Sequence, residues 1–437
     1  MNGPATTSQA TRVAVIGGGW AGMAAAVELA LAGVPVTVYE AAKTLGGRAR
    51  RVDVNGIVLD NGLHILIGAY RETLRLIETV RDRASPSRLL RLPLQLRIEP
   101  DFRFAAMRLP APFHLAFGLL FARGVSGSER LAAARFILAQ RRARYRCDEM
   151  LSVRELLERF RQPRRLRERL WEPLCVSALN TDPDEASAQV FLTVLRDTLD
   201  APAAASDLLL PATDFTAIFP APAQAFIESR SGQVRIGEPV TRIRSRADGI
   251  EVEAADRIRY SHAIIAVGPH RLEHVATDIA ELQSAVEQVR ALEFQPIYSV
   301  FLQYPDSVSL AWPMIGFTGG LAQWVFDRGR LCGQRGMLGV VISAAGAHQD
   351  LPHNELASRV HTELTAALRL PPPLWHQVIA EKRATFACKP GIVRPGNRTP
   401  VKGLYLAGDY TASDYPATLE AAVRSGITCA RLILRDA

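Results

Sequence analysis

Near the N-terminus the apolar positions form two short runs with a longer run between them. Val13–Ile16 is an apolar run of strand length that stops at glycines, as is typical of a strand buried in a parallel sheet. Residues 23–32 are rich in alanine and predict a helix, and Gly33 suits the position just beyond its end. Residues 36–39 predict a second strand, so the order of elements indicates a βαβ unit.

Further along the chain, helix-like and strand-like periods alternate. Ser126 with Glu129, and Ser152 with Glu155, have capping-box spacing, and each pair opens an arginine-rich helix. The strand patterns after residue 291 predict a sheet separate from the βαβ unit. We expect strands within residues 90–104, 233–243, 257–267, 297–302, 339–342 and 381–386, and helices at 71–81, 126–144, 152–161 and 352–368.

The turn after the first strand carries a glycine fingerprint. Gly17, Gly19 and Gly22 have the G-x-G-x-x-G spacing: the first permits a tight turn, the second a close approach to pyrophosphate, and the third close packing of helix on strand. Glu40 ends the second strand, where its carboxylate would accept the hydroxyls of an unphosphorylated ribose, as in FAD or NAD. The positions expected at this dinucleotide are Gly17, Gly19, Trp20, Ala21, Gly22 and Glu40.

Composition adds size and cellular setting. With 437 residues and 48% hydrophobic content the chain can bury a large core, and we expect two domains. No apolar run reaches the roughly 18 residues that a spanning helix requires, and residues 1–11 lack the features of a secretion signal. The five cysteines suggest neither a disulfide framework nor a metal site, so we expect a cytoplasmic location.

The formal net charge of +8 comes almost wholly from arginine, since lysine occurs only four times. One explanation is GC-rich coding, and another is attraction to anionic lipid headgroups. Nucleic acid is not expected as a partner, because the basic residues are not interleaved with aromatic residues and no binding module is visible.

A second glycine motif separates FAD from NAD. Residues 45–50 read Leu-Gly-Gly-Arg-Ala-Arg, so backbone N–H groups and a guanidinium can approach a phosphate together. This motif resembles the second fingerprint of the amine-oxidase and carotenoid-desaturase group of flavoproteins. Residues 403–409, Gly-Leu-Tyr-Leu-Ala-Gly-Asp, resemble the closing motif of the same group.

That resemblance implies a non-covalent FAD in a Rossmann-type α/β domain. Gly408 and Asp409 would meet the pyrophosphate and the ribityl chain, a helix from about Thr418 would point at the flavin, and the backbone of Val240 would contact adenine. Gly47 and Arg48 complete the expected cofactor positions. Because motifs lie at both ends, we expect the FAD-binding domain to combine residues 12–80, 226–290 and 395–437, and an α+β substrate domain with a mixed sheet and helices to combine 81–225 and 291–394.

Longer passages resemble a narrower family. Residues 59–73, 108–115 and 171–196 are similar to the squalene-associated flavoproteins known as hydroxysqualene dehydroxylases, although residues 413–415 depart from that pattern. The resemblance implies conversion of hydroxysqualene and reduced FAD to squalene, oxidised FAD and water. The hydroxyl is allylic, so its protonation and loss leave a delocalised cation that hydride can quench. This chemistry needs one general acid and a dry, apolar pocket for a long polyprene.

Few acids are available for that proton. Asp60 and His64 follow the second motif, and Asp182 lies in the polar part of residues 171–191. Each has a structural alternative: Asp60 can hold a turn, His64 can pack on the flavin, and Asp182 in Asp-Pro-Asp can cap a helix. No triad and no metal constellation is visible, so the general acid stays open.

Two other functions fit the same motifs. A phytoene-type carotenoid desaturase would use the same cofactor with hydride flowing the other way, and a flavin-holding protein could present polyprenes to partners without catalysis. No second dinucleotide fingerprint is present, so we expect the reductant to be another protein or transiently bound NADPH.

One apolar stretch, residues 109–122, is too short to span a bilayer but long enough to lie in one face of it. The alternative is a buried helix that lines the substrate cavity. Membrane contact would place the protein on the inner face of the cytoplasmic membrane, beside neighbouring squalene-pathway enzymes as expected partners.

Overall fold

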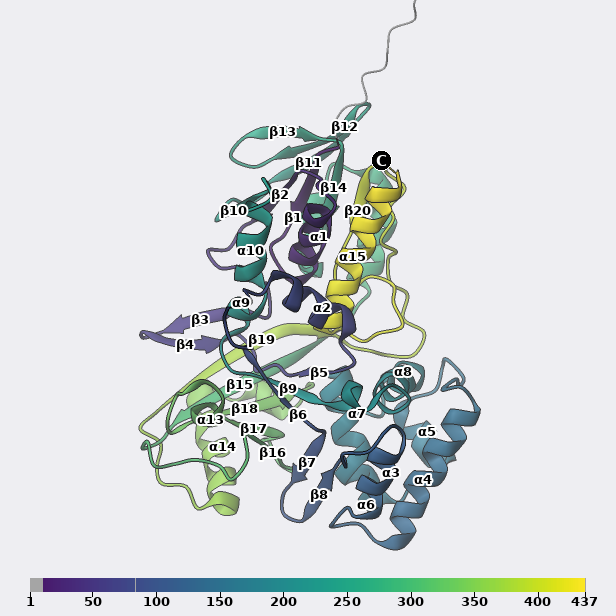
Figure 1. Ribbon diagram of the computed structural model, residues 1–437, viewed down its shortest axis with the longest axis vertical. Helices are drawn as coiled ribbons and strands as arrows, with labels where there is room; N and C mark the ends of the chain where they lie inside the picture. The colour runs from purple at the N-terminus through teal and green to yellow at the C-terminus, as the bar shows by residue number, and fades with distance from the viewer. Residues whose placement is uncertain (1–10, 83, 437) are drawn as a thin grey trace, which may run out of the picture.

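The upper half of the molecule in Figure 1 contains a five-stranded parallel sheet. The structure is a computed structural model that describes residues 11–82 and 84–436, so the N-terminal residues 1–10, in the segment expected to lack a secretion signal, lie outside it. Every neighbouring pair of strands in this sheet is parallel. In spatial order the strands are β10 (Gln233–Ile236), β2 (Val36–Glu40), β1 (Val13–Ile16), β14 (His262–Ile265) and β20 (Leu404–Leu406).

The central strand β1 is buried on both faces, as its unbroken apolar run predicts. Val13 and Val15 pack in the same hydrophobic cluster as the helix α1 (Trp20–Leu31). Ala14 and Ile16 pack in a second cluster, which includes residues of the antiparallel sheet β11 (Arg242–Arg246), β12 (Gly249–Glu253) and β13 (Arg257–Tyr260). Alternating side chains of one strand therefore serve two layers.

The helix α1 begins three residues before the expected start at Met23. Trp20 is its first residue, because the helix already starts within the glycine fingerprint. The weak helix propensity of glycine had favoured a loop there. At the other end Gly33 adopts a φ of 75°, which is the left-handed position after a helix.

Two helices flank α1 on the same face of the sheet (Figure 1). These are α10 (Pro220–Glu228) and α15 (Leu419–Asp436), and α15 approaches α1 very closely. A Cβ placed on Gly426 of α15 would lie 2.0 Å from the carbonyl oxygen of Ala21. Only glycine permits this contact, which joins residues from the two ends of the sequence.

The lower left of Figure 1 holds a mixed sheet of seven strands. The helix α14 (His353–Leu368) packs on β15 and β19, in agreement with the expected helix at 352–368. Neighbouring strands are antiparallel except for β7 and β16. In order they are β19 (Trp375–Phe386), β15 (Phe294–Gln303), β18 (Met337–Ser343), β17 (Trp324–Asp327), β16 (Met314–Gly316), β7 (Gln95–Ile98) and β8 (Phe102–Ala105).

The lower right holds a group of helices that we call the helical lobe, residues 113–199. Both expected capping boxes are present: Ser126 pairs with Glu129, and Ser152 with Glu155. The helices are α3 (Phe113–Leu120), α4 (Gly127–Arg142), α5 (Val153–Arg159), α6 (Arg164–Leu166), the π-turn Arg167–Trp171, α7 (Glu172–Leu179) and α8 (Ala188–Leu199).

Smaller elements connect the two halves. A hairpin and a three-stranded sheet, β5-β9-β6, lie between the five-stranded sheet and the lobe. Residues 90–104, 233–243 and 257–267 each contain parts of strands from different sheets, because tight turns divide the expected runs. These smaller elements are α2 (Arg71–Val80), α9 (Phe215–Ile218), α11 (Pro269–Ala276), α12 (Gln283–Arg290), α13 (Arg328–Cys332), β3 (Arg51–Val54), β4 (Ile57–Asp60), β5 (Leu66–Ile67), β6 (Leu89–Leu92), β9 (Leu208–Pro211) and short 3₁₀ turns at Ala203–Ser206, Ala280–Leu282 and Ala347–Asp350.

The expected fold class is confirmed, because α/β layers and a mixed α+β half are both present. The strands of the parallel sheet come from the segments 12–80, 226–290 and 395–437. The division of the chain into two domains at those boundaries stays a prediction.

Candidate functional site

Two glycine loops meet at the carboxyl edge of the parallel sheet. Gly46 donates its N–H to the carbonyl oxygen of Gly18 at 2.9 Å, and Gly19 and Gly46 form an isolated β-bridge. A Cβ on Gly19 would meet only the Cα of Gly47, at 3.9 Å. The two backbones therefore form a shallow cradle that side chains would fill, and a pyrophosphate fits such a cradle.

The N-terminus of α1 favours the binding of an anion in this cradle. Its N-cap, Gly19, has no side chain to cap the helix, and the first turn carries no acidic residue. The N–H groups of the first turn thus keep their hydrogen-bonding capacity for a phosphate. Gly17 shapes the entry, with a φ of 114° and a Cβ position only 2.5 Å from the carbonyl oxygen of Ala266.

Trp20 and Ala21 have buried side chains, so only their backbone groups are left for the predicted cofactor contact. The indole Nε1 of Trp20 donates to the carbonyl oxygen of Ala49 at 3.2 Å, and its ring lies 5.0 Å from that of Phe219. Both residues are buried, so their side chains belong to the core. Gly22 lets the helix pack on the turn, because a Cβ there would lie 1.9 Å from the carbonyl oxygen of Gly17.

Glu40 is held in place at the end of β2. Its Oε2 accepts the N–H of Gly18 at 2.6 Å, and its Oε1 accepts the N–H of Ala42 at 2.8 Å. Each oxygen retains a lone pair, so the carboxylate can still accept ribose hydroxyls. The loop that leads to Val240 runs beside this position, since the N–H of Glu238 donates to the carbonyl oxygen of Glu40 at 2.9 Å.

Arg48 links the second motif to the closing motif. Its Nη2 lies 2.5 Å from Oδ1 of the buried Asp409, and its Nη1 donates to the carbonyl oxygen of Ala384 in β19 at 2.6 Å. Next to Asp409, Gly408 has a φ of 156° and donates its N–H to Ser425 Oγ at 2.9 Å. The cradle thus continues toward the seven-stranded sheet, and a phosphate contact of Arg48 stays a prediction.

Thr418 directly precedes α15, close to the start that the sequence predicts. Its Oγ1 accepts the N–H of Ala421 at 3.2 Å. The sequence offered no signal for the next contact: the fully buried Glu420 accepts the N–H of Thr73 at 2.9 Å and that of Glu72 at 3.2 Å. Glu420 therefore caps α2 and joins it to α15.

Asp60 and His64 both lie close to Phe215. Asp60 is buried at the end of β4, accepts the N–H of Phe215 at 2.9 Å and lies 3.4 Å from Nη1 of Arg328. Burial raises the pKa of Asp60 to about 6, against the opposing effect of Arg328. The ring of His64 lies 5.2 Å from that of Phe215.

His64 is a neutral imidazole near pH 7. Burial lowers the pKa of His64 to about 4, although the hydrogen bond to Gly62 acts in the opposite direction. Its Nδ1 lies 2.6 Å from the carbonyl oxygen of Gly62, so Nδ1 is the donor and carries the proton. Its Nε2 is thus an acceptor and has no proton to give.

Asp182 lies apart from these two residues, in the exposed turn between α7 and α8. Its Oδ1 accepts the N–H of Asp184 at 2.8 Å within this turn, whereas the N-cap of α8 is Ser187, so Asp182 does not cap a helix as the alternative expected. The buried part of the same passage bonds to protein: Asn180 donates to Thr385 Oγ1 at 2.9 Å and accepts the N–H of Ala344 at 2.7 Å. These polar groups fasten the helical lobe to the seven-stranded sheet.

Asn61 was not expected at the site. It donates from Nδ2 to the carbonyl oxygen of Arg48 at 3.1 Å and to Oε2 of Glu381 at 3.2 Å. The signal for it was its place directly after Asp60, downstream of the second motif. Within residues 11–82 and 84–436, no group of three or more His, Cys, Asp or Glu side chains could hold a metal ion.

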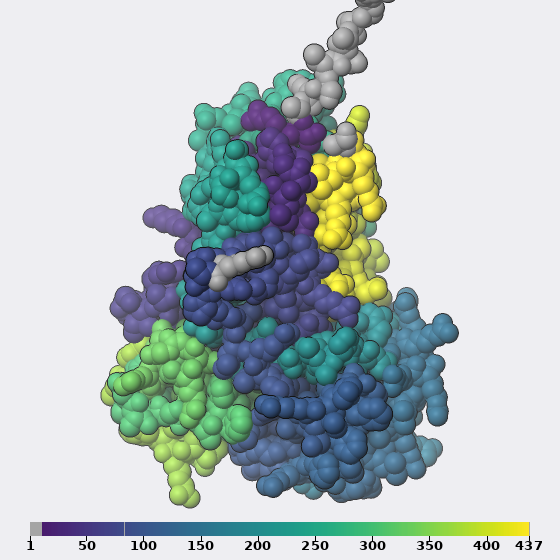
Figure 2. Space-filling view, in the orientation of Figure 1, coloured from purple at the N-terminus to yellow at the C-terminus, as the bar shows by residue number. Residues whose placement is uncertain are grey.

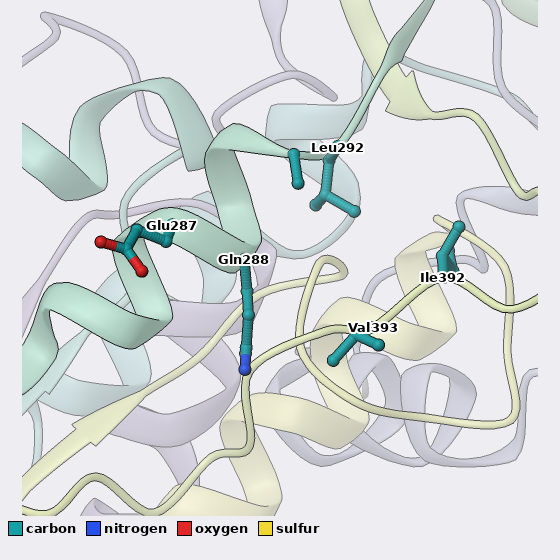
Figure 3. A pocket seen from close by; sticks show the side chains of 6 residues that line it. Glu287, Gln288, Leu292, Ile392 and Val393 are labelled. Carbon is teal, nitrogen blue, oxygen red and sulfur yellow. The ribbon is translucent and has the colours of Figure 1, made fainter.

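Two pockets are lined by residues outside the glycine loops. One of about 420 Å³ lies between the end of α12, with Gln288 and Leu292, and the loop carrying Ile392 and Val393 (Figure 3). A small one of about 20 Å³ is mainly apolar, and the guanidinium of Arg97 in its wall lies 3.6 Å from the ring of Trp312. Its remaining lining residues are Leu92, Pro93, Gln95, Leu208, Leu210, Pro313 and Met314.

The dinucleotide cradle lies at the topological switch point of the parallel sheet, where the strand order reverses beside β1. Together with the neighbouring mixed sheet, it defines an FAD-dependent oxidoreductase. The sequence profile of the flavin containing amine oxidoreductases matches residues 20–434. A protein of Rhodopseudomonas palustris named hydroxysqualene dehydroxylase is 30% identical over 97% of this chain and 98% of its own length. The chain therefore belongs to the flavin containing amine oxidoreductases and, within them, to the hydroxysqualene dehydroxylase family.

Other similar proteins agree with this family. A hydroxysqualene dehydroxylase of Sinorhizobium fredii is 29% identical over 97% of this chain and 98% of its own. A 15-cis-phytoene desaturase of an Oncidium hybrid is 26% identical over 97% of this chain and 78% of its own. An oxidoreductase from Methanosarcina mazei has a TM-score of 0.74 at 16% identity, covering 95% of this chain and 99% of that one, which shows the shared fold.

Proposed function

We propose that the protein is a hydroxysqualene dehydroxylase, which reduces hydroxysqualene to squalene. The observation that carries this proposal is similarity along nearly the full length of proteins bearing that name, combined with a complete backbone cradle for FAD. The same cradle would serve other flavin oxidoreductases, so the substrate is assigned from the relatives and the reaction from chemistry.

The proposed reaction balances in protons and electrons. The allylic C–O bond breaks, a proton joins the departing hydroxyl to form water, and a hydride completes the new C–H bond. Bound, reduced FAD supplies that hydride and loses two electrons. The protein's own tasks are to hold the polyprene, exclude water and deliver one proton.

The apolar side chains for the first two tasks surround His64. Its neighbours Leu63 and Ile65 pack in one hydrophobic cluster with Leu208 and Leu210 of β9. Met314, Phe326 and Val341 of the seven-stranded sheet belong to the same cluster. These side chains, some of which line the small pocket beside β9, would give a polyprene bound there an apolar surface.

Asp60 is the first residue to test as the proton donor. Its pKa of about 6 leaves a fraction of the carboxyl protonated near neutral pH, whereas His64 is already neutral there. Asp182 is exposed and occupied by its turn. The contacts of Asp60 with Phe215 and Arg328 also support the structural alternative, and the assay below separates the two roles.

The test is an anaerobic single turnover. The flavin of the purified protein is reduced chemically, hydroxysqualene is added in detergent, and flavin absorbance is followed while lipids are extracted. We expect reoxidation with stoichiometric squalene. A flavin that stays reduced with unchanged lipid would refute the proposal.

Two substitutions sharpen the same assay. Asp60→Asn keeps an acceptor for the N–H of Phe215 and should slow squalene formation by roughly 10²- to 10⁴-fold, with bound flavin unchanged. Asp182→Asn is the matched control and should leave the rate unaltered. An equal rate for wild type and Asp60→Asn would show that Asp60 has only the structural role of holding the turn.

The alternative of a phytoene-type desaturase uses the oxidised enzyme. Its support is the similarity to a phytoene desaturase, which covers less of that protein's length. This alternative would be favoured if phytoene reduced the flavin of the oxidised protein while hydroxysqualene left the flavin of the reduced protein unchanged. The physiological reductant is proposed to be external, either a protein or NADPH, and anaerobic bleaching by NADPH alone distinguishes them.

A further inference from the structure

The helix α3 exposes an apolar face. Phe113, Ala116, Phe117, Leu120 and Phe121 are all exposed and follow the spacing of one helical face, which we call the outer face of α3. On the opposite side His114 and Gly118 are buried. The exposed fractions are 56% for Phe113, 40% for Phe117, 53% for Leu120 and 65% for Phe121.

The loop before the helix extends this face. Met107 and Leu109 are exposed, and the N–H of Met107 donates to the carbonyl oxygen of His114 at 3.0 Å, which holds the loop against α3. Across the described residues, six of the sixteen exposed large hydrophobic side chains lie between Met107 and Phe121, within this loop and helix. Such a concentration marks an interaction surface rather than ordinary scatter.

The surrounding segment is strongly basic. Residues 102–199 contain seventeen arginines and eleven acidic residues, a net charge of +6 out of the +8 of the whole chain. Arg108 and Arg123 are exposed just before and just after the apolar stretch. Neither has an ion-pair partner within residues 11–82 and 84–436.

This surface lies at one end of the molecule. In Figure 1, α3 and α6 are at the lower end of the long axis, opposite β12 and β13. In Figure 2, the blue part of the chain that includes them forms the lower right of the surface. A surface that contacts α3 therefore need not cover the FAD cradle.

We propose that the outer face of α3 docks the protein onto a bilayer that contains anionic phospholipid. The eight residues of α3 span about 12 Å, so the helix lies in the plane of the interface instead of crossing it. Its apolar side chains enter the boundary between headgroups and acyl chains, and Arg108 and Arg123 meet lipid phosphates. No helix in the described part of the chain combines the length and apolar character that crossing a bilayer requires.

Charge favours lipid over a second copy of this chain. A two-fold dimer through α3 would bring the same basic segments toward each other, and like charges there oppose association. An anionic membrane satisfies both the apolar face and its basic border. The inference is independent of the reaction, because docking is measured without substrate.

The experiment is co-sedimentation of the FAD-loaded, full-length protein with vesicles. We expect binding to vesicles of equimolar phosphatidylcholine and phosphatidylglycerol, and at least roughly tenfold weaker binding to phosphatidylcholine alone. The triple variant Phe113→Ser, Phe117→Ser and Phe121→Ser should lower the partition constant by roughly tenfold or more. Retained flavin absorbance shows that the variant is folded.

Matched controls distinguish binding through the outer face of α3 from non-specific effects of exposed apolar or basic side chains elsewhere. Leu374→Ser with Val393→Ser removes two exposed apolar side chains elsewhere and should leave binding unchanged. Arg108→Gln with Arg123→Gln should weaken binding to anionic vesicles by roughly fivefold per arginine at low salt, whereas Arg257→Gln on β13 should not.

Two results would overturn the proposal. One is a triple variant that sediments with anionic vesicles as well as the wild type. The other is a wild type that ignores vesicles but forms a concentration-dependent dimer by light scattering, with the dimer lost in the triple variant. The second result would assign the face to a second copy of the chain.

Discussion

The helices α1 and α3 are both short and strongly apolar, yet their burial is opposite. Ten of the twelve residues of α1 are buried, against two of the eight residues of α3. The helix α15 covers α1, with Gly426 against Ala21, and α10 covers another side. In contrast, β8 and α4 cover only the inner side of α3.

The difference shows what an apolar helix requires of its surroundings. Burial of α1 depends on small residues that let helices approach closely, and it positions the N–H groups that face the cofactor. The exposed apolar side chains of α3 are poorly solvated by water, which costs free energy. An exposed apolar patch of this kind is typical of a surface that another apolar phase covers. One helix is organised around the cofactor, and the other is organised around an external surface.

The largest expected effect is that of Gly426→Ala, which disrupts the packing of α15 on α1. In an open helix this change would stabilise by about 1 kcal/mol. Here the new methyl group would lie 2.0 Å from a carbonyl oxygen. We expect a loss of about 3 kcal/mol in the free energy of unfolding, together with weaker FAD retention. Chemical denaturation and flavin absorbance measure both, and Gly127→Ala, which meets nothing within 4 Å, is the control.

A smaller effect concerns the pH dependence of Asp60, beside the cofactor motifs. Its pKa is raised to about 6 from 3.8, so the folded protein binds this proton more tightly than the unfolded chain does. Its stabilising contribution is therefore full below about pH 4 and is lost as the pH rises through 6. Relative to Asp60→Asn, the wild type should lose about 2–3 kcal/mol of unfolding free energy between pH 4 and pH 7. Parallel stability curves for the two proteins would contradict this.

The smallest effect is expected on the outer face of α3. Phe117→Ser removes an exposed ring and should change the free energy of unfolding by less than about 0.5 kcal/mol. Leu29→Ala in the buried face of α1 should cost about 3 kcal/mol. Thermal denaturation of the two variants compares the helices directly, and similar losses for both would mean that α3 is covered in the folded protein.

The cofactor half could be predicted from the sequence because its geometry permits few residue types. Gly17 needs a positive φ, Gly22 has no room for a Cβ, and Glu40 must follow the strand beside the cradle. These requirements are local, so spacing alone reveals them. The start of α1 was misplaced because helix propensity is low at glycine, whereas the tertiary fold sets the helix start there.

Contacts between distant residues could not be predicted in this way. Arg48 and Asp409 are 361 positions apart, and Glu420 and Thr73 are 347 apart, so no spacing rule connects them. The burial of α3 was also undecidable, because its apolar residues lie on both helical faces and periodicity cannot say which face is covered. The roles of Asp60 and Asp182 depended on their hydrogen-bond partners, which only the fold supplies.

The position of β20 and α15 has a consequence for biosynthesis. A ribosome makes β1, β2, β10 and β14 long before Leu404–Leu406 can complete the sheet, and Gly426 reaches Ala21 later still. Nascent chains therefore carry an uncovered α1 and an unfinished cradle, which chaperones would need to shield. Because Asp409 and α15 are among the last parts made, we expect FAD to be bound only after they have been synthesised.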